Sequence, residues 1–183
     1  MKKTVLTFGL LAGLVLAVTM VATLPFLDTI GDMGYVVGYT SMVLAFLLVF
    51  FGVRSYRENV LGGTIGFGRA LGVGLAIVLV ASVCYVATWE VIYFKFRPDF
   101  AEKYGQASID KARASGASAE VIAQKTKEAH DFAVMYHNPL INIAFTFLEP
   151  LPPGVVLALV SAGILRRKRR ADDVGAARPV TAT

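Results

Sequence analysis

The chain has 183 residues, of which 56% are hydrophobic and 17% are charged. The apolar share exceeds the roughly 45–50% of soluble domains, and a soluble fold could not bury such long apolar runs, so a soluble globular protein is excluded. The formal net charge is +5. The excess lies beside the apolar runs, where membrane orientation accounts for it, and so indicates neither a nucleic acid nor an acidic substrate.

Four apolar runs of about 20 residues or more predict membrane-spanning helices. We place them at about 4–24, 34–53, 70–94 and 140–165. The first run follows Lys2 and Lys3 but is longer than the roughly 7–15 residues of a secretory signal core, so we expect an uncleaved span. The fourth is interrupted at Glu149 and Pro150. The expected fold class is all-α, an integral membrane four-helix bundle.

The distribution of lysine and arginine predicts the orientation of these spans. Ten positive residues lie in short segments on one side, namely Lys2, Lys3, Arg54, Arg57, Arg69 and the run 166–170. On the other side, the first connection carries Asp28 and Asp32 and no positive residue, and the second, 95–139, has seven positive and six acidic residues. Positive residues favour the cytoplasmic side, so both termini are predicted to be cytoplasmic.

The long second connection predicts an extracytoplasmic helical hairpin over about 98–137. Pro98 suits a first helical turn, Asp99 and Lys103 are four residues apart, and Ser118 can cap a second helix after a break at Gly116. An apolar stripe is expected on the second helix at Ile122, Ala129, Phe132, Ala133 and Tyr136. The hairpin could be a ligand-binding cap or a pair of solvated helices that merely connects two spans.

Rows of small residues recur at intervals of four within two spans. They are Gly9, Gly13 and Ala17 in the first span, and Gly68, Gly72 and Ala76 in the third. Such rows let helix backbones approach closely in a membrane. We expect them to pack within the chain, and a homodimer seam is the alternative.

Two carboxylates fall inside the predicted spans, where ionisable groups are costly and have partners. Glu90 follows Arg69 by 21 residues, about 31 Å of helix, and Glu149 precedes Arg166 by 17 residues, about 25 Å. Both are therefore predicted in one layer of the outer leaflet. They could form one coupled site or two independent glutamates at the interface.

The residues around Glu149 extend this candidate intramembrane polar site to Thr146 and Pro150. Proline has no N–H, so Pro150 cannot donate to the carbonyl of Thr146, four residues earlier. That oxygen needs another partner, such as water, a cation or a protonated Glu90. Alternatively, Pro150 simply begins a short helix at its first turn.

Motifs for catalysis and metal binding are mostly absent from the sequence. It has no P-loop, no His-Glu-x-x-His and no Gly-x-Ser-x-Gly, so we expect neither an enzyme nor a cofactor. His130 and His137 are seven residues apart, but solvated histidines are the expectation, and no metal site is assigned. The single cysteine, Cys84, permits no intrachain disulfide.

Short motifs in a fixed order over residues 1–168 resemble the domain of unknown function 4199 family of bacteria. They are Met1-Lys2-Lys3, Gly38-Tyr39-Thr40-Ser41-Met42, Arg54-Ser55-Tyr56-Arg57, Gly66-Phe67-Gly68-Arg69-Ala70, Tyr85 with Thr88-Trp89-Glu90, Asn138-Pro139-Leu140, Phe147-Leu148-Glu149-Pro150 and Arg166-Arg167-Lys168. The resemblance implies a four-span protein of the bacterial inner membrane. It implies no activity, substrate or cofactor.

Together these patterns predict a four-span membrane domain over 1–170, followed by a disordered cytoplasmic tail over 171–183. The expected function is that of a non-enzymatic accessory or interaction protein in the lipid bilayer, with a homo-oligomer or a membrane protein as partner and no nucleic acid. The alternative is a small transporter or channel element that uses Glu90 and Glu149 for a proton, a cation or a small solute. A membrane enzyme ranks third.

Overall fold

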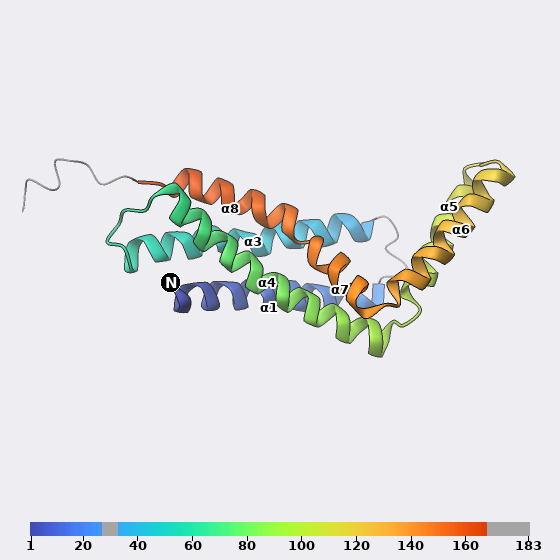
Figure 1. Cartoon of the computed structure of the whole chain (residues 1–183), viewed down its shortest axis with the longest axis horizontal. Coiled ribbons are helices and arrows are strands. Elements are labelled where there is room, and N and C mark those ends of the chain that lie inside the picture. The colour runs from blue at the N-terminus through green and yellow to red at the C-terminus, as the bar shows by residue number, and fades with distance from the viewer. Residues whose placement is uncertain (27–32, 168–183) are drawn as a thin grey trace, which may run out of the picture. The chain divides into compact units, whose positions relative to one another are not determined.

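The computed structural model describes residues 1–26 and 33–167, and Figure 1 shows its helices. The helices are α1 (Lys2–Thr23), η1 (Leu24–Phe26), α3 (Met33–Asn59), α4 (Phe67–Phe96), α5 (Phe100–Ala114), α6 (Ala119–Tyr136), α7 (Pro139–Leu148) and α8 (Leu151–Leu165). The predicted acidic connection with Asp28 and Asp32, the basic residues after Arg167 and the predicted tail 171–183 lie outside the described residues. Within the described residues, the all-α fold class is confirmed.

Four helical stretches are long and apolar enough to cross a membrane. They are Lys2–Phe26, Met33–Asn59, Phe67–Phe96 and Pro139–Leu165. The four predicted spans lie within them, and the helices at the second and third spans extend further, to Asn59 and from Phe67. The predicted interruption of the fourth span is present as well, because α7 ends at Leu148 and α8 begins at Leu151.

The described chain divides into two compact units. Unit 1 comprises residues 1–81 and 151–167, and unit 2 comprises residues 82–150. The helix α4 contributes its first half to unit 1 and its second half to unit 2.

In unit 1, α3 contacts both α1 and α8. The fully buried side chains at its centre include Leu16, Phe46, Val49, Ile77 and Ala158. The outer faces of the same helices carry exposed Leu14, Leu44 and Val160. Such surfaces suit hydrocarbon as the surrounding solvent, because helices satisfy their own backbone groups and leave apolar side chains free to face lipid.

Close backbone approach in unit 1 depends on glycine. A Cβ atom added to Gly154 of α8 would lie 2.5 Å from Cγ1 of Val78, and one added to Gly9 of α1 would lie 2.6 Å from Cβ of Val80. Packing within the chain is thus confirmed for Gly9. The same expectation is wrong for Gly68 and Gly72. These two residues lie on the exposed face of α4 and have nothing within 4 Å of an added Cβ.

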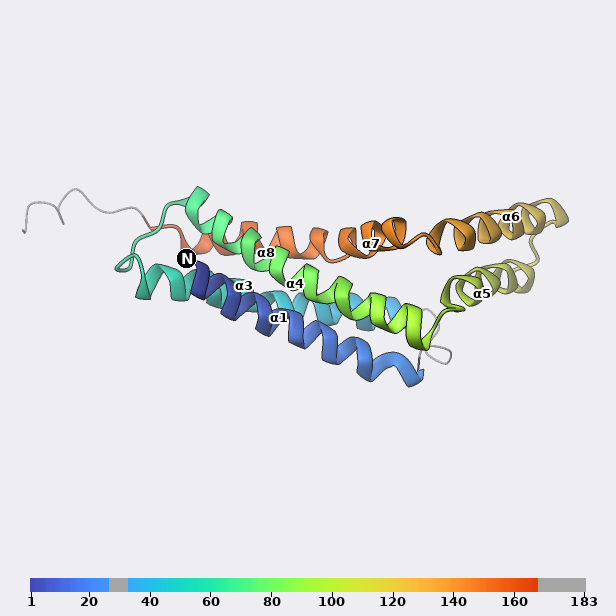
Figure 2. The same ribbon diagram turned by 60° about the horizontal axis from the view of Figure 1, so that its bottom comes forward.

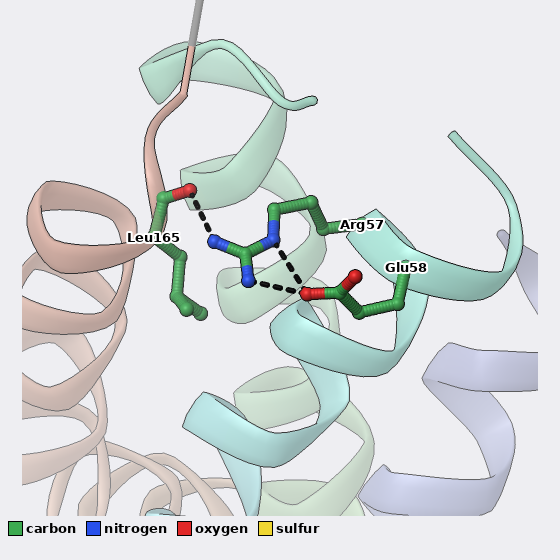
Figure 3. Close-up of polar contacts among 3 residues, drawn as sticks. All are labelled: Arg57, Glu58 and Leu165. Atoms are coloured by element: carbon green, nitrogen blue, oxygen red, sulfur yellow. Dashed lines mark hydrogen bonds and ion pairs between the residues drawn. The ribbon is translucent and has the colours of Figure 1, made fainter. Parts of the chain in front are cut away.

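One end of unit 1 is held together by contacts between distant parts of the sequence. Arg57 of α3 donates from Nη1 to the carbonyl oxygen of Leu165 at 3.2 Å, and its guanidinium also pairs with Glu58 (Figure 3). Beyond α8, Ile65 and Arg167 exchange two backbone hydrogen bonds of 3.1 and 2.9 Å. The carbonyls of the last helical turn lack partners inside the helix, so the Arg57 cation stabilises the end of α8.

In unit 2, α5 and α6 pack against each other, as Figure 2 shows. Gly105 allows this approach, since an added Cβ would lie 2.7 Å from Cβ of Ala129. The predicted cap is present, because the Ser118 hydroxyl accepts from the amide of Val121 at 3.3 Å. The predicted ion pair of Lys103 and Asp99 is present as well, at 2.7 Å.

The expectation that Pro98 lies in the first turn of α5 is wrong. The helix begins at Phe100, with Asp99 at its N-cap position. The amide of Phe100 donates to the carbonyl of Arg97 at 3.0 Å, which closes a turn between α4 and α5 with Pro98 at its second position. The fixed φ of proline suits that position, so the turn accounts for Pro98.

Candidate functional site

Polar side chains of α7 lie at the spacing that brings residues onto one side of a helix. Asn142, Thr146 and Glu149 are four and three residues apart, and the first two are buried. The helix begins where Asn138 accepts from the amide of Leu140 at 3.0 Å, with a proline next to it.

Asn142 and Thr146 satisfy part of each other's hydrogen-bonding capacity. The Thr146 hydroxyl donates to Oδ1 of Asn142 at 3.2 Å, and Nδ2 of Asn142 donates to the backbone carbonyl of Tyr136 at 3.4 Å. Asn142 has no solvent exposure and Thr146 has 4%. Buried polar groups are costly without such partners, so this pair ties α7 to the end of α6.

The carboxylates of Glu149 and Glu90, both in unit 2, differ in their hydrogen-bond partners. Glu149, at the end of α7, accepts a hydrogen bond at Oε2 from the hydroxyl of Tyr85 at 2.9 Å. The Oε1 atom of Glu90 is buried, and no hydrogen-bond partner for it is found in the described parts of the chain. The predicted coupling of the two carboxylates stays a prediction.

Tyr136 interacts with polar groups of both α4 and α7. Its hydroxyl accepts a hydrogen bond from Nε1 of Trp89 at 2.9 Å. Burial raises the pKa of the Tyr136 phenol, hydrogen bonds with Thr146 and Trp89 oppose that rise, and the negative charges of Glu149 and Glu90 add to it. Both carboxylates therefore lie within electrostatic reach of one buried phenol.

A second polar chain joins α4, α5 and α6. The hydroxyl of Tyr93 lies 3.0 Å from Nδ1 of His137, and Nε2 of His137 lies 2.8 Å from Oε1 of Glu102. With its proton on Nε2, the imidazole donates to Glu102 and accepts from Tyr93. His137 is exposed, as expected of a solvated histidine, and it also bridges α4 and α5. The described residues contain no group of three or more metal-ligating side chains.

Aromatic rings pack against Tyr93 and Tyr136. Tyr93 and Tyr136 meet edge to face at 5.4 Å between ring centroids, and Trp89 meets Phe100 in the same way at 4.8 Å. Ala101 and Ala133 complete this buried cluster. The small alanines leave room for the rings, which fix the direction of the polar groups that they carry.

Sequence reasoning found Glu90, Glu149, Thr146 and Pro150 but did not find Asn142, Tyr85 or the bridging role of His137. A signal was present on α4, where Tyr85, Trp89 and Tyr93 repeat at intervals of four. That interval places side chains on one face of a helix. The preference of aromatic residues for a membrane interface could also account for this row, so the row alone did not indicate a polar site.

The arrangement gathers carboxylate, hydroxyl and amide groups on α4 and α7, which belong to stretches that are long and apolar enough to span a membrane. By length and composition, the chain is a helical membrane protein. A model of the family of proteins of unknown function DUF4199 matches residues 7–167, and the chain belongs to this family. No match was found among curated proteins or among solved structures.

Proposed function

We propose that this chain is a non-enzymatic accessory or interaction protein of the bacterial inner membrane. In this proposal, a four-helix bundle crosses the bilayer with both termini in the cytoplasm, and α5 and α6 form a hairpin outside. Its partner is another membrane protein or a second copy of the chain.

The observation that carries the proposal is the attachment of α5 and α6 to the rest of unit 2. The pair packs closely at Gly105 and is joined to α4 through Trp89 and Tyr136 and through Tyr93 and His137. A simple connection between two spans needs none of these contacts. A rigid pair of helices with a polar outer surface is the kind of element that can present a defined face to a partner.

Site-directed photo-cross-linking in native membranes tests the proposal. A cross-linking residue at Ala107 of α5 or Ala123 of α6, both exposed, should trap the same protein that co-purifies with the whole chain in fixed stoichiometry. The matched control is Leu44, an exposed apolar residue of α3 that should contact lipid. Equal cross-linking at all three positions, or none at Ala107 and Ala123, would contradict the proposal.

The proposed topology has its own test. Reporter fusions after Asn59 and after Arg170 should report the cytoplasm, and a fusion after Gly116 should report the outside. The basis is the distribution of lysine and arginine. A carboxyl terminus on the outside would overturn this topology.

A second candidate function is movement of a proton, a cation or a small solute. It is favoured by the buried, unpartnered oxygen of Glu90 among the described residues and by the bond between Tyr85 and Glu149. In many membrane proteins, ionisable groups within the spanning segments mark transport pathways. In proteoliposomes, Glu90→Gln and Glu149→Gln should each abolish uptake, with Glu120→Gln on α6 as the control. Uptake that survives in the double variant would remove this candidate.

The same variants test whether the two carboxylates form one site. Thermal unfolding of each single variant and of the double variant gives their coupling energy. A coupled pair should depart from additivity by about 0.5 kcal/mol or more. Additive effects would leave two independent glutamates.

A further inference from the structure

Arginine side chains gather at one end of unit 1. Arg54 and Arg57 lie near the end of α3, and Arg166 and Arg167 follow α8. The bond from Arg57 to the carbonyl of Leu165 holds the two segments together (Figure 3). The backbone pairing of Arg167 with Ile65 also ties the end of α8 to the connection between α3 and α4. The positive charges are therefore fixed near one another by contacts that do not depend on any ligand.

Glu58 offsets only part of this charge. It pairs with Arg57 and lies within electrostatic reach of Arg54 and Arg167 as well. Among the described residues, Arg54 and Arg166 form no ion pair, and both are exposed. Three exposed arginines, Arg54, Arg166 and Arg167, thus remain with no carboxylate of their own.

Exposed apolar side chains lie on α3 and α8, close in sequence to these arginines. Phe51 is three residues before Arg54 on α3 and is 51% exposed, and Ile164 lies in the last turn of α8 and is 65% exposed. Residues three apart are neighbours on a helix surface, so Phe51 and Arg54 present one mixed face. A free phosphate ion would satisfy the charges of this surface and leave its apolar part uncovered. A phospholipid satisfies both.

We propose that this end of unit 1 binds an anionic phospholipid. Arg54, Arg166 and Arg167 surround the phosphate group, and an acyl chain lies along Phe51 and Ile164. Guanidinium groups suit phosphate because they donate several hydrogen bonds in one plane. The site is independent of the accessory role proposed above and requires only that this end of the helices lies at a membrane surface.

Native mass spectrometry of the full chain, released from detergent, tests the proposal. Phosphatidylglycerol and phosphatidylcholine with the same acyl chains serve as the probes. The chain should retain phosphatidylglycerol in preference, and a higher salt concentration should weaken that retention. Each basic residue near a lipid surface contributes about fivefold in affinity, so Arg54→Gln with Arg166→Gln should weaken phosphatidylglycerol binding by about 30-fold.

The control is a double variant that removes the same charge from unit 2. Arg113→Gln with Lys127→Gln alters two exposed residues of α5 and α6 and should leave lipid retention unchanged. Helix content and melting temperature are measured for all variants. Should the test variant fail to fold, the single variants Arg54→Gln and Arg166→Gln replace it, and each should weaken phosphatidylglycerol binding by about fivefold.

Several results would overturn the proposal. Equal retention of the two lipids would mean that the surface does not recognise the anionic headgroup. Equal effects of the test and control variants would mean that net charge matters and not this site. Displacement of the lipid by glycerol phosphate at the same concentration would show a site for soluble anions and not for a lipid.

Discussion

Nε2 of His137 lies 2.8 Å from Oε1 of Glu102, and this contact joins the end of α6 to the first turn of α5. The pKa of Glu102 is held below its ordinary value, first by a hydrogen bond from its own backbone amide and then by the hydrogen bond with His137. Burial of the carboxyl group and the nearby charge of Asp99 act in the opposite direction on this pKa. Hydrogen bonds to the ionised form favour that form, so the folded chain stabilises the carboxylate.

The stability contribution of Glu102 should therefore depend on pH. Because its folded pKa lies below the unfolded value of 4.5, the contribution is complete above that value and is lost as the pH falls through the folded pKa. Both side chains are about half exposed, so the contribution is at most about 1 kcal/mol. Glu102→Gln should lower the melting temperature by about 1–3 °C at pH 7 and by less at pH 3, where part of this contribution is lost.

The control for that experiment is Glu120→Gln, which alters another exposed carboxylate in the first turn of a helix, α6. It lacks a bond to a histidine and should show a smaller effect at pH 7. An effect of Glu102→Gln that is equal at both pH values would contradict a stabilising role for the ionised Glu102 carboxylate.

The bond between Trp89 and Tyr136 can be followed by fluorescence, because Trp89 is the only tryptophan of the chain. Tyr136→Phe removes the acceptor of the indole N–H and leaves that donor unpaired in a partly buried place. The expected cost is about 1–2 kcal/mol of unfolding free energy, with a shift in the emission spectrum. Tyr39→Phe on α3 should change neither property. An unchanged spectrum in Tyr136→Phe would show that the bond is absent in the membrane-bound protein.

Two glycines of α8 provide a matched test of helix packing. Gly154→Ala places a methyl group 2.5 Å from Cγ1 of Val78, whereas Gly163→Ala meets nothing within 4 Å. The first change should destabilise the chain by about 1–3 kcal/mol through overpacking. The second should be neutral or stabilise it, because alanine favours a helix more than glycine does. Reversible unfolding in mixed micelles measures the free-energy change of each variant. Equal effects of the two changes would contradict the close packing of Gly154 against Val78.

Arg57 is expected to protect the end of α8. Arg57→Gln weakens the bond to the carbonyl of Leu165, which is 108 residues away in the sequence, at a cost of about 1 kcal/mol. Amide hydrogen exchange over the last turn of α8 should then be about fivefold faster. Arg54→Gln, one turn earlier on α3, should leave this exchange rate unchanged. Similar rates in both variants would argue that the end of α8 needs no cation.

The sequence predicted the helical elements well, because a membrane span must be helical and apolar and local caps follow local rules. The runs that became α1, α3 and α4 were visible from their lack of charge, and Ser118 and the pair of Asp99 and Lys103 were visible from their spacing. Each of these features depends on residues within a few positions of one another.

Contacts between helices could not be predicted in this way. A span that is apolar on every side does not reveal which face meets its neighbour, so Gly72 resembled Gly9 in sequence and proved to be exposed. The bond of Tyr85 with Glu149 and that of Trp89 with Tyr136 join residues 64 and 47 positions apart. Their geometry depends on how α4, α6 and α7 are rotated about their axes.

The backbone pairing of Ile65 with Arg167 sets a practical limit for shortening the chain. A chain that stops after Arg167 keeps the residues needed for both hydrogen bonds, and the family match ends at the same residue. A chain that stops after Leu165 leaves the amide and the carbonyl of Ile65 without these partners, although every residue of α8 is still present. Truncations for crystallisation, or tags attached at this end, should therefore begin beyond Arg167.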